Sequence, residues 1–235
     1  MLNWTFNFLT PRSSRDELGS VIIDISPLLC PELAGWDGDQ RFLYSESFSQ
    51  AQGASVTVGC AHGSLHLGAH VDAPRHFRSD GEAVSELPLE SFWGPAQIVD
   101  LTQVEGSRPL MPEDFRVALP LRAPRLLLKT RASLAPETEF YKDFVYPSPQ
   151  LASYLGALGV LLLGTDAPSM DRWDDPLLPG HHALYGAGIS ILEGLRLAEV
   201  DPNLDYELSA LPLKIKSGDA GWTRAALKVI PMKRG

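Results

Sequence analysis

The spacing of the histidines constrains the fold of this chain more than any other feature of its sequence. Four of the six histidines fall between positions 62 and 76, and the other two stand at 181 and 182. In the segment LHLGAHVDAPRHF, the side chains able to bind a metal stand at 66, 70, 72 and 76, which is one face of an extended strand. A straight strand would separate His66 from His70 by about 13 Å, although ligands of one ion must each approach it to about 2 Å. The chain must therefore bend between them.

The residues around the two histidines suit such a bend. Gly68 supplies conformational freedom between His66 and His70, and Pro74 opposes a regular strand beyond Asp72. An α-helix would bring the two histidines together, but it would turn Asp72 away from them, and both Gly68 and Pro74 oppose it. We therefore predict a strand, a turn and a short irregular segment, with imidazoles and a carboxylate that converge on a metal.

A set of core histidines with satisfied hydrogen bonds, beside an aspartate in a turn, is the alternative interpretation of this segment. Four such polar groups so close together would be costly to bury unpaired, whereas imidazole and carboxylate are ligands that borderline cations accept. The metal site is therefore favoured. His62 precedes the bend and lacks a partner in the spacing argument, so we expect it at the surface or behind the ligands.

A second cluster lies in HHALYGAGISILEGL. In a strand, Glu193 would share a face with Ile189 and Ile191, where an unpaired charge is costly and a metal would remove that cost. Alternatively, Glu193 opens a helix after an apolar run. Adjacent histidines in an extended segment point in opposite directions, so only one of His181 and His182 is expected to bind the metal, and periodicity does not choose between them.

Composition and charge narrow the class of protein. The 235 residues fit a single domain, which we assign to residues 20–235 after an N-terminal extension of residues 1–19. A net charge of -9 without a run of Lys or Arg argues against nucleic acid as a partner. The start lacks the pattern of a signal peptide, and no stretch is long and apolar enough to span a membrane. Cys30 and Cys60 lack CxxC spacing, which suits reduced thiols in a cytoplasmic protein.

Strands are expected to outnumber helices. The sequence predicts strands at 21–26, 54–59, 96–101, 125–130, 159–166, 206–215 and 223–231, several of them apolar throughout and therefore buried on both faces. Helices are expected at 112–119 and 147–158, the second with Ser148 as N-cap and Pro149 at the first helical position. The irregular alternation favours a single mixed α/β domain over a regular doubly wound sheet.

The run HLGAHVDAPRHF resembles the HxGTHxDxPxH signature of the cyclase family of metal-dependent hydrolases. The resemblance continues through GTDAPSMD, HHALYGAGISILEGL and YELSALPLK, in the order and rough spacing of the kynurenine formamidase branch of that family. It covers nearly everything from Asp24 to about Leu227. The resemblance implies a mixed β/β/α domain of the swivelling type, commonly assembled as a homodimer.

The resemblance also implies roles for individual residues. Zinc is the implied metal, two ions per subunit, with manganese as the alternative. By matching position, the first zinc is bound by His66, His70 and Asp72, and the second by Asp72 and His181, while Glu193 contacts both. His76 matches the catalytic acid/base, and Trp36 matches a residue that contacts an aromatic substrate.

Several positions depart from the family pattern. Asp37 stands where proline usually follows the tryptophan, and Leu67 replaces a small polar residue. Trp222 replaces a proline in GDAGWTR, which keeps an Asp and an Arg at Asp219 and Arg224. These departures concern specificity more than metal binding.

Three residues outside the matched ligand set keep two interpretations each. Asp166 and Asp171 could line the pocket or serve in turns. Cys60 is either a ligand in a structural metal site or a small buried apolar residue.

The activity implied by the resemblance is hydrolysis of N-formylkynurenine to kynurenine and formate, a step of tryptophan degradation. One alternative is a cyclic amide or lactone hydrolase of the same family, such as one acting on isatin. A metal-containing protein that binds a small ligand without turnover is the alternative of another class. A structural zinc site is usually closed by four protein ligands and needs no acid/base, so His76 argues against it.

Overall fold

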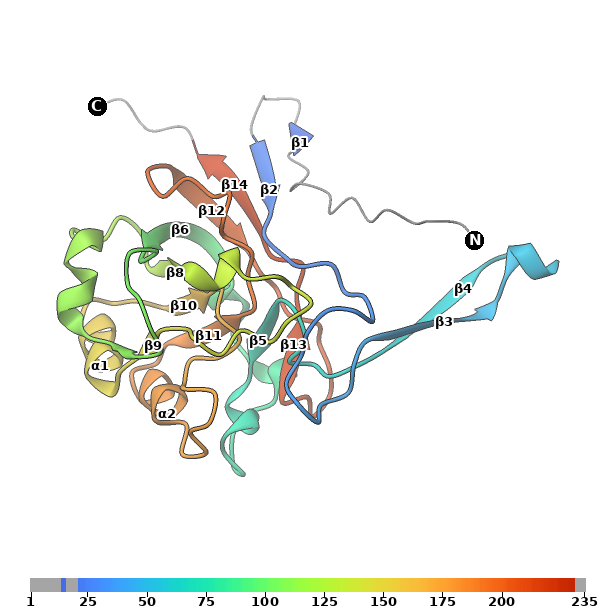
Figure 1. The fold of residues 1–235 in the computed structure, drawn as a ribbon, viewed down its shortest axis with the longest axis horizontal. Helices are drawn as coiled ribbons and strands as arrows, with labels where there is room; N and C mark the ends of the chain where they lie inside the picture. The colour runs from blue at the N-terminus through green and yellow to red at the C-terminus, as the bar shows by residue number, and fades with distance from the viewer. Residues whose placement is uncertain (1–13, 16–20, 231–235) are drawn as a thin grey trace.

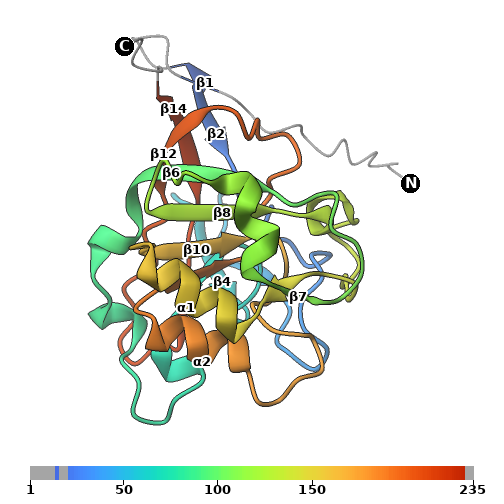
Figure 2. The same cartoon turned by 90° about the vertical axis from the view of Figure 1, so that its left-hand side faces the viewer.

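The computed structural model describes residues 14–15 and 21–230. Its main sheet has ten strands, of which β6, β8, β10 and β11 run parallel to their neighbours in this group while every other pairing is antiparallel (Figures 1 and 2). In spatial order, the strands are β1 (Ser14–Arg15), β2 (Val21–Asp24), β14 (Ala226–Ile230), β12 (Asp205–Ser209), β6 (Trp93–Asp100), β8 (Arg125–Lys129), β10 (Leu162–Thr165), β11 (Ser190–Glu193), β5 (His70–Asp72) and β13 (Ala220–Trp222).

The central parallel strands are buried on both faces. In β8, the side chain of Leu127 packs into one hydrophobic cluster, while its neighbours Leu126 and Leu128 pack into another on the opposite face. Helices α1 (Pro149–Ala157) and α2 (Pro179–Gly186) lie side by side over the second of these faces (Figure 2). The continuous apolar runs in the sequence are therefore explained by burial on two sides.

Helix α1 is where it was predicted. The Ser148 side chain accepts a hydrogen bond from the Leu151 amide at 3.1 Å, and Pro149 stands at the first helical position. The helix predicted at 112–119 is instead the 3-10 helix η5 (Pro112–Ala118). Pro120 lacks the N–H that would bond the Arg116 carbonyl in an α-helix, and the Leu119 amide takes that carbonyl.

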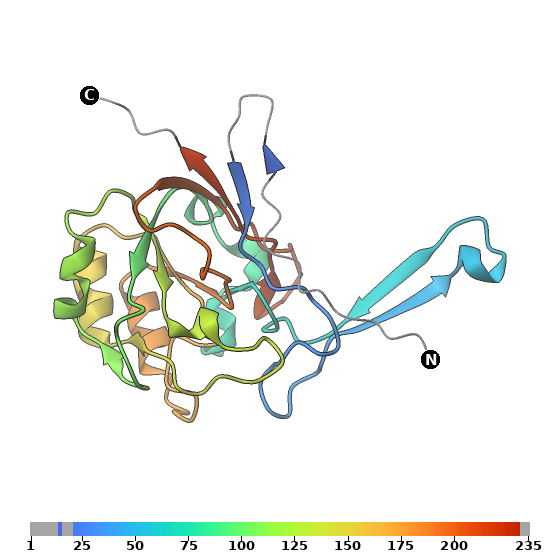
Figure 3. The ribbon, with the colours of Figure 1, turned by 45° about the horizontal axis from the view of Figure 1, so that its top comes forward.

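The predicted strand at 54–59 is displaced. The strand there is β4 (Val58–His62), which pairs antiparallel with β3 (Leu43–Phe48), a strand that the sequence did not predict. The two form a hairpin that extends away from the body of the molecule (Figures 1 and 3), and every residue of both strands is exposed. Positions 54–57 belong to its tip, where the Gln50 amide bonds the Thr57 hydroxyl at 3.1 Å.

The remaining elements are short. The parallel pair β7 (Pro109–Leu110) and β9 (Tyr146–Pro147) forms a third sheet. Five further 3-10 helices are η1 (Gln50–Gln52), η2 (Pro74–His76), η3 (Val84–Glu86), η4 (Leu89–Ser91) and η6 (Arg131–Leu134). The predicted fold class, a single mixed α/β domain in which strands outnumber helices, is confirmed.

The predicted N-terminal extension lies largely outside the described residues. Its two described residues, Ser14 and Arg15, form β1 and pair antiparallel with Ile22 and Val21 at the edge of the main sheet. Among the described residues, no helix is long and apolar enough to cross a membrane.

Candidate metal centre and active site

A left-handed bend at Gly68 brings the first two histidines together. Gly68 has φ +72°, a conformation that residues with a Cβ rarely adopt, and its carbonyl accepts a hydrogen bond from His70 Nδ1 at 2.9 Å. His66 lies in the turn before the bend, and the ring centroids of the two histidines are 5.0 Å apart. The predicted bend is confirmed, but the predicted order of strand, turn and short irregular segment is wrong: the turn with His66 comes first, and β5 and then η2 follow it.

Strand pairing adds the second carboxylate to the same face. Glu193 lies directly opposite His70 in the antiparallel pair of β11 and β5, and Asp72 is two residues further along β5. Directly opposed residues and residues two apart share a face of the sheet, so these three side chains point the same way. The Met170 amide donates to Glu193 Oε1 at 2.7 Å and fixes that carboxylate.

His181 reaches the cluster from a helix. We expected an extended segment, but residues 179–186 form α2, in which neighbouring side chains point about 100° apart rather than in opposite directions. His181 is 2% exposed, whereas His182 is exposed to solvent. The Asp171 carboxylate accepts hydrogen bonds from the Gly180 and His181 amides and from His181 Nδ1 at 2.6 Å. Asp171 therefore holds the start of α2 and orients this imidazole.

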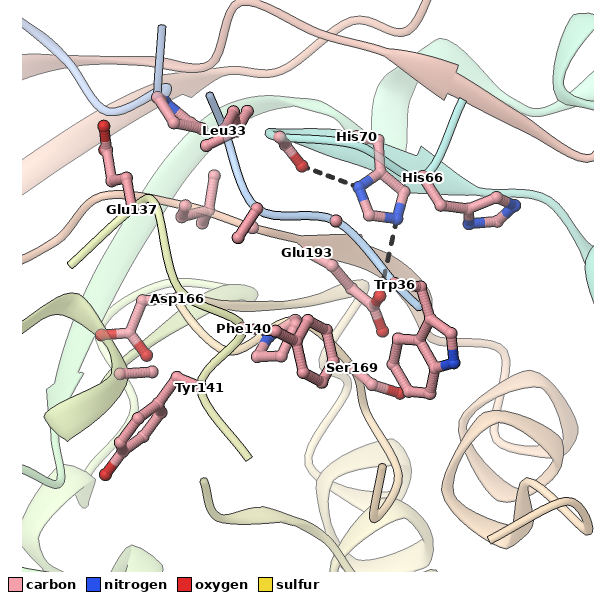
Figure 4. A pocket seen from close by; sticks show the side chains of 18 of the residues that line it. Leu33, Trp36, His66, His70, Glu137, Phe140, Tyr141, Asp166, Ser169 and Glu193 are labelled. Carbon is pink, nitrogen blue, oxygen red and sulfur yellow. Dashed lines mark hydrogen bonds and ion pairs between the residues drawn. The ribbon is translucent and has the colours of Figure 1, made fainter. Parts of the chain in front are cut away.

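The cluster converges on Asp72. Its Oδ1 lies 3.1 Å from His66 Nδ1 and 3.3 Å from His70 Nε2. Its Oδ2 lies 3.2 Å from His181 Nε2. Glu193 closes the group, with Oε2 at 3.5 Å from His70 Nε2, as Figure 4 marks, and Oε1 at 3.5 Å from His181 Nε2. These five side chains include the sequence-predicted ligands, and the structure brings all of them together.

The hydrogen bonds of the two buried imidazoles indicate what the cluster holds. His70 Nδ1 faces a carbonyl and His181 Nδ1 faces a carboxylate, both acceptors, so each ring donates from Nδ1 and turns Nε2 into the cluster. Both Nε2 atoms face carboxylate oxygens, so with a cation bound each Nε2 would offer it a lone pair. His70 Nε2 and Asp72 Oδ1 are buried without a hydrogen-bond partner. A cation between these atoms would satisfy all of them, so the donor set fits a metal site.

The electrostatics of the cluster favour a cation. Burial by itself would lower the pKa of His70, but hydrogen bonds and charge interactions with Asp72 and Glu193 raise that pKa to about 10. The pKa of Asp72 is held well below its usual range by the three histidines around it, although burial opposes this. The same negative field that attracts protons to these imidazoles attracts a divalent cation.

His76 lies beside the cluster. It ends η2, its side chain is 31% exposed, and its ring centroid is 4.0 Å from that of His66 and 5.9 Å from that of His181. Burial lowers the pKa of His76 and, with the nearby imidazoles, outweighs the nearby carboxylates, so the ring is neutral at pH 7. A neutral imidazole can accept a proton.

Asp219 is a site residue whose position the sequence reasoning did not find. Its Oδ2 lies 3.1 Å from His66 Nε2 and 3.9 Å from His76 Nδ1. It directly precedes β13, whose pairing with β5 sets Ala220 opposite Asp72. No spacing between Asp219 and the ligands in the sequence indicates that pairing.

A cavity of about 360 Å³ opens onto the cluster (Figure 4). Among the residues that line it are His66, His70, His76, His181, Glu193, Trp36, Phe140, Tyr141 and Asp166. Trp36 is 42% exposed and contacts Phe140 edge to face, with ring centroids 4.9 Å apart. The volume and the mixture of aromatic and polar walls are typical of a site for a small molecule.

The other residues singled out from the sequence lie elsewhere. Asp166 is buried and accepts hydrogen bonds from Thr130 and Ser133 at one edge of the cavity. Trp222 packs against the small hydrophobic cluster that contains Phe42 and Leu67, and its indole N–H donates to the Ser64 carbonyl at 2.8 Å. Cys60 is exposed on β4, 3.1 Å from the Ser47 hydroxyl, so both of its expected roles, ligand and buried apolar residue, are wrong. His62 is exposed at the end of β4, as predicted.

The comparison with protein families defines the class of this protein. Residues 23–172 match the family model described as "Putative cyclase". The match spans more than half of the chain, so the chain belongs to the cyclase family of metal-dependent hydrolases.

Within the family, the chain is similar to kynurenine formamidases. It is 42% identical to the kynurenine formamidase of Salinibacter ruber over 211 residues, which are 89% of this chain and 98% of the relative. It is 39% identical to the kynurenine formamidase of Bacillus cereus (strain ATCC 14579) over 208 residues, 88% of this chain and 97% of the relative.

Among solved structures, the fold is similar to that of isatin hydrolase A from Labrenzia aggregata. The TM-score is 0.78 at 25% identity, with 89% of this chain and 94% of the other covered. A structure described as a potential metal-dependent hydrolase with cyclase activity gives a TM-score of 0.75 at 25% identity, with coverages of 89% and 98%. These neighbours agree with the family and the cyclase-like fold predicted from the sequence.

Proposed function

We propose that the chain hydrolyses N-formylkynurenine to kynurenine and formate. The observation that carries the proposal is the buried convergence of imidazole nitrogens and two carboxylates on one wall of an aromatic-lined cavity, beside His76. Similarity to kynurenine formamidases over most of the chain supports this substrate.

Zinc is the proposed metal, with two ions per subunit and manganese as the alternative. His66, His70 and Asp72 would hold one ion, Asp72 and His181 would hold the other, and Glu193 would contact both. When bound, such ions lower the pKa of a water to about 7 and polarise the carbonyl under attack. The ligand set of imidazole and carboxylate accepts either metal.

The side chains of the chain itself carry the proton and hold the substrate. His76 accepts the proton of the water that attacks the formyl carbon and returns it to the aryl nitrogen as the C–N bond breaks. Formate and an aromatic amine result. Trp36 contacts the aromatic ring of the substrate at the open side of the cavity, next to Phe140. Asp171 keeps His181 in the tautomer that the site requires.

Hydrolysis of a cyclic amide such as isatin is the second candidate. The similarity of the fold to isatin hydrolase A at 25% identity favours it, and the same side chains could perform it. In this reaction the bond that breaks is the ring C–N bond, and the nitrogen that His76 protonates stays attached to the product.

We also propose a cytoplasmic homodimer. The β3–β4 hairpin supports the dimer, because it exposes Leu43, Tyr44, Phe48 and Val58 away from the body of the chain. An isolated two-stranded hairpin is marginal in water and is stabilised when its apolar side chains pack against another surface. Light scattering of the purified protein would give twice the chain mass.

The experiment that tests the activity uses protein stripped of metal and reloaded with zinc or manganese. Turnover of N-formylkynurenine is followed by kynurenine absorbance and by formate release, with isatin assayed in parallel. Fast, metal-dependent release of formate supports the formamidase. Turnover of isatin alone would favour the cyclic amide hydrolase over the formamidase. A metal-loaded protein that is inactive on both substrates would contradict both proposed activities.

A His76→Ala variant tests the proton carrier. It is expected to retain its metal, because the five other side chains supply the ligand atoms, and to lose about 10²–10⁴-fold in turnover. Loss of the metal from this variant would make His76 a ligand instead.

A further inference from the structure

We propose that Asp219 is a positioning residue that orients both the metal ligand His66 and the acid/base His76 through a single carboxylate oxygen. Its Oδ2 is 3.1 Å from His66 Nε2 and 3.9 Å from His76 Nδ1. The role at His66 follows from the geometry of the cluster. The role at His76 rests on the function proposed above.

The contact with His66 determines which nitrogen faces the metal. His66 Nδ1 points toward Asp72 Oδ1 at 3.1 Å, so this nitrogen must carry the lone pair when a cation is bound. Its proton then lies on Nε2, where Asp219 is the hydrogen-bond acceptor. Asp219 thus does for His66 what the Gly68 carbonyl does for His70 and what Asp171 does for His181.

The contact with His76 limits the rotation of a ring that also packs against the imidazole of His66, with ring centroids 4.0 Å apart. His76 is the most exposed of the four clustered imidazoles, and among the described residues Asp219 is its only ion-pair partner within 4.0 Å. A distance of 3.9 Å is longer than a hydrogen bond, but catalytic contacts often tighten only when the substrate is bound. The negative charge of Asp219 also favours the cationic ring that forms when His76 takes a proton.

The backbone fixes Asp219 relative to both partners. The Asp219 carbonyl accepts a hydrogen bond from the Ala73 amide at 2.9 Å, and Ala73 joins the ligand strand β5 to η2, which ends at His76. The preceding Gly218 carbonyl accepts the Val84 amide at 2.9 Å. Because these bonds use main-chain atoms, a change of the Asp219 side chain leaves them in place.

A third metal ion held by His66, His76 and Asp219 is the competing explanation, since these three side chains also lie close enough together to share an ion. The exposure of the site argues against it. The Asp219 side chain is 47% exposed, whereas those of Asp72 and Glu193 are 1% and 4% exposed. In addition, both nitrogens of His66 would then have to bind metals.

The test compares Asp219→Asn and Asp219→Ala with Asp205→Asn, a control that changes a similarly exposed carboxylate on β12 paired with Arg122. The measurements are the metal content, the zinc affinity by competition with a chromophoric chelator, the absorption spectrum of the cobalt-loaded protein, and kcat and KM with saturating metal.

Each variant has a distinct expected result. The amide oxygen of Asn can still accept from His66 Nε2, so Asp219→Asn is expected to keep zinc affinity within about threefold while kcat falls about tenfold or more at an unchanged KM. In Asp219→Ala the acceptor is lost, so zinc affinity is expected to fall about 10–100-fold, with an altered cobalt spectrum. Asp205→Asn should match the unchanged protein in all four measurements.

Other outcomes would overturn the proposal. If Asp219→Ala binds zinc as tightly as Asp205→Asn, with the same cobalt spectrum, Asp219 does not orient His66. If kcat of Asp219→Asn is unchanged, it does not orient His76. Loss of one equivalent of metal from Asp219→Asn would show a third ion instead. Zinc affinity is measured without a substrate, so failure of the proposed reaction in the unchanged protein is a separate result.

Discussion

Substitution of Gly68 by alanine tests whether the bend at this residue builds the metal site. With φ +72°, a residue that has a Cβ costs about 1–2 kcal/mol more than glycine. The added methyl would also lie 2.8 Å from Leu29 Cδ2, the end of a flexible, partly buried side chain that can shift, so this contact adds about 1 kcal/mol, the lower end of the range for overpacking. The expected loss of stability is therefore about 2–3 kcal/mol.

Gly159→Ala is the matched control. Gly159 has φ +78°, nearly the same strain, but no atom lies within 4 Å of the position of its added methyl. The entropy that alanine removes from the unfolded chain is common to both variants and cancels in the comparison. The control should therefore lose only about 1–2 kcal/mol and keep its metal affinity.

Calorimetry of the metal-free proteins separates the two variants. For a chain of this size, about 1 kcal/mol lowers Tm by roughly 2–4 °C, so Gly68→Ala should melt roughly 4–12 °C below the unchanged protein and also below Gly159→Ala. Because the Gly68 carbonyl orients His70, zinc affinity should fall about 10–100-fold in Gly68→Ala alone. Equal melting temperatures and equal zinc affinities in the two variants would refute the role assigned to this bend.

Three further predictions concern the metal, the exposed cysteine and pH. Removal of the metal with a chelator should lower Tm. If the free metal concentration was a thousand times the Kd before removal, the lost stability is about 4 kcal/mol. An unchanged Tm in calorimetry would mean that the cluster binds no ion. Cys60→Ser should keep the full metal content by elemental analysis, because this thiol lies on the exposed hairpin, and a lower content would return Cys60 to the ligand set. Arg108 holds the pKa of the Asp114 carboxyl below its ordinary value of 3.8. The ionised pair therefore stabilises the fold fully above pH 3.8. This stabilisation is lost as the pH falls through the lower pKa of the folded state. Asp114→Asn should thus lower the free energy of unfolding at pH 7 by at most about 1 kcal/mol, and in acid the variant and the unchanged protein should be equally stable. Urea unfolding at several pH values measures this difference. The same difference at every pH would contradict the prediction.

The site could be predicted from the sequence to the extent that its ligands are close in the chain. The spacing of His66, His70 and Asp72 required a bend at Gly68, and the bend is there. Likewise, Ser148 and Pro149 predicted the start of α1, because capping depends only on neighbouring residues. Local chemistry was sufficient in both cases.

Other parts of the structure depend on contacts that no local pattern contains. Helix α2 is short and includes two glycines, and its first turn is held by Asp171, which lies nine residues before Gly180. Strand β3 has no buried face and therefore no alternation of apolar and polar residues to mark it. Asp219 joins the site only through the pairing of β13 with β5.

The central position of β5 between β11 and β13 restricts how the length of this chain can vary among homologues. His70 lies opposite both Glu193 and Trp222, so the insertion of one residue within any of the three strands would turn its side chains to the other face of the sheet. An insertion at the tip of the β3–β4 hairpin, at positions 50–57, changes no such pairing in the main sheet. We therefore expect insertions and deletions among homologues to gather in the hairpin, which would let its length diverge while the metal centre stays the same.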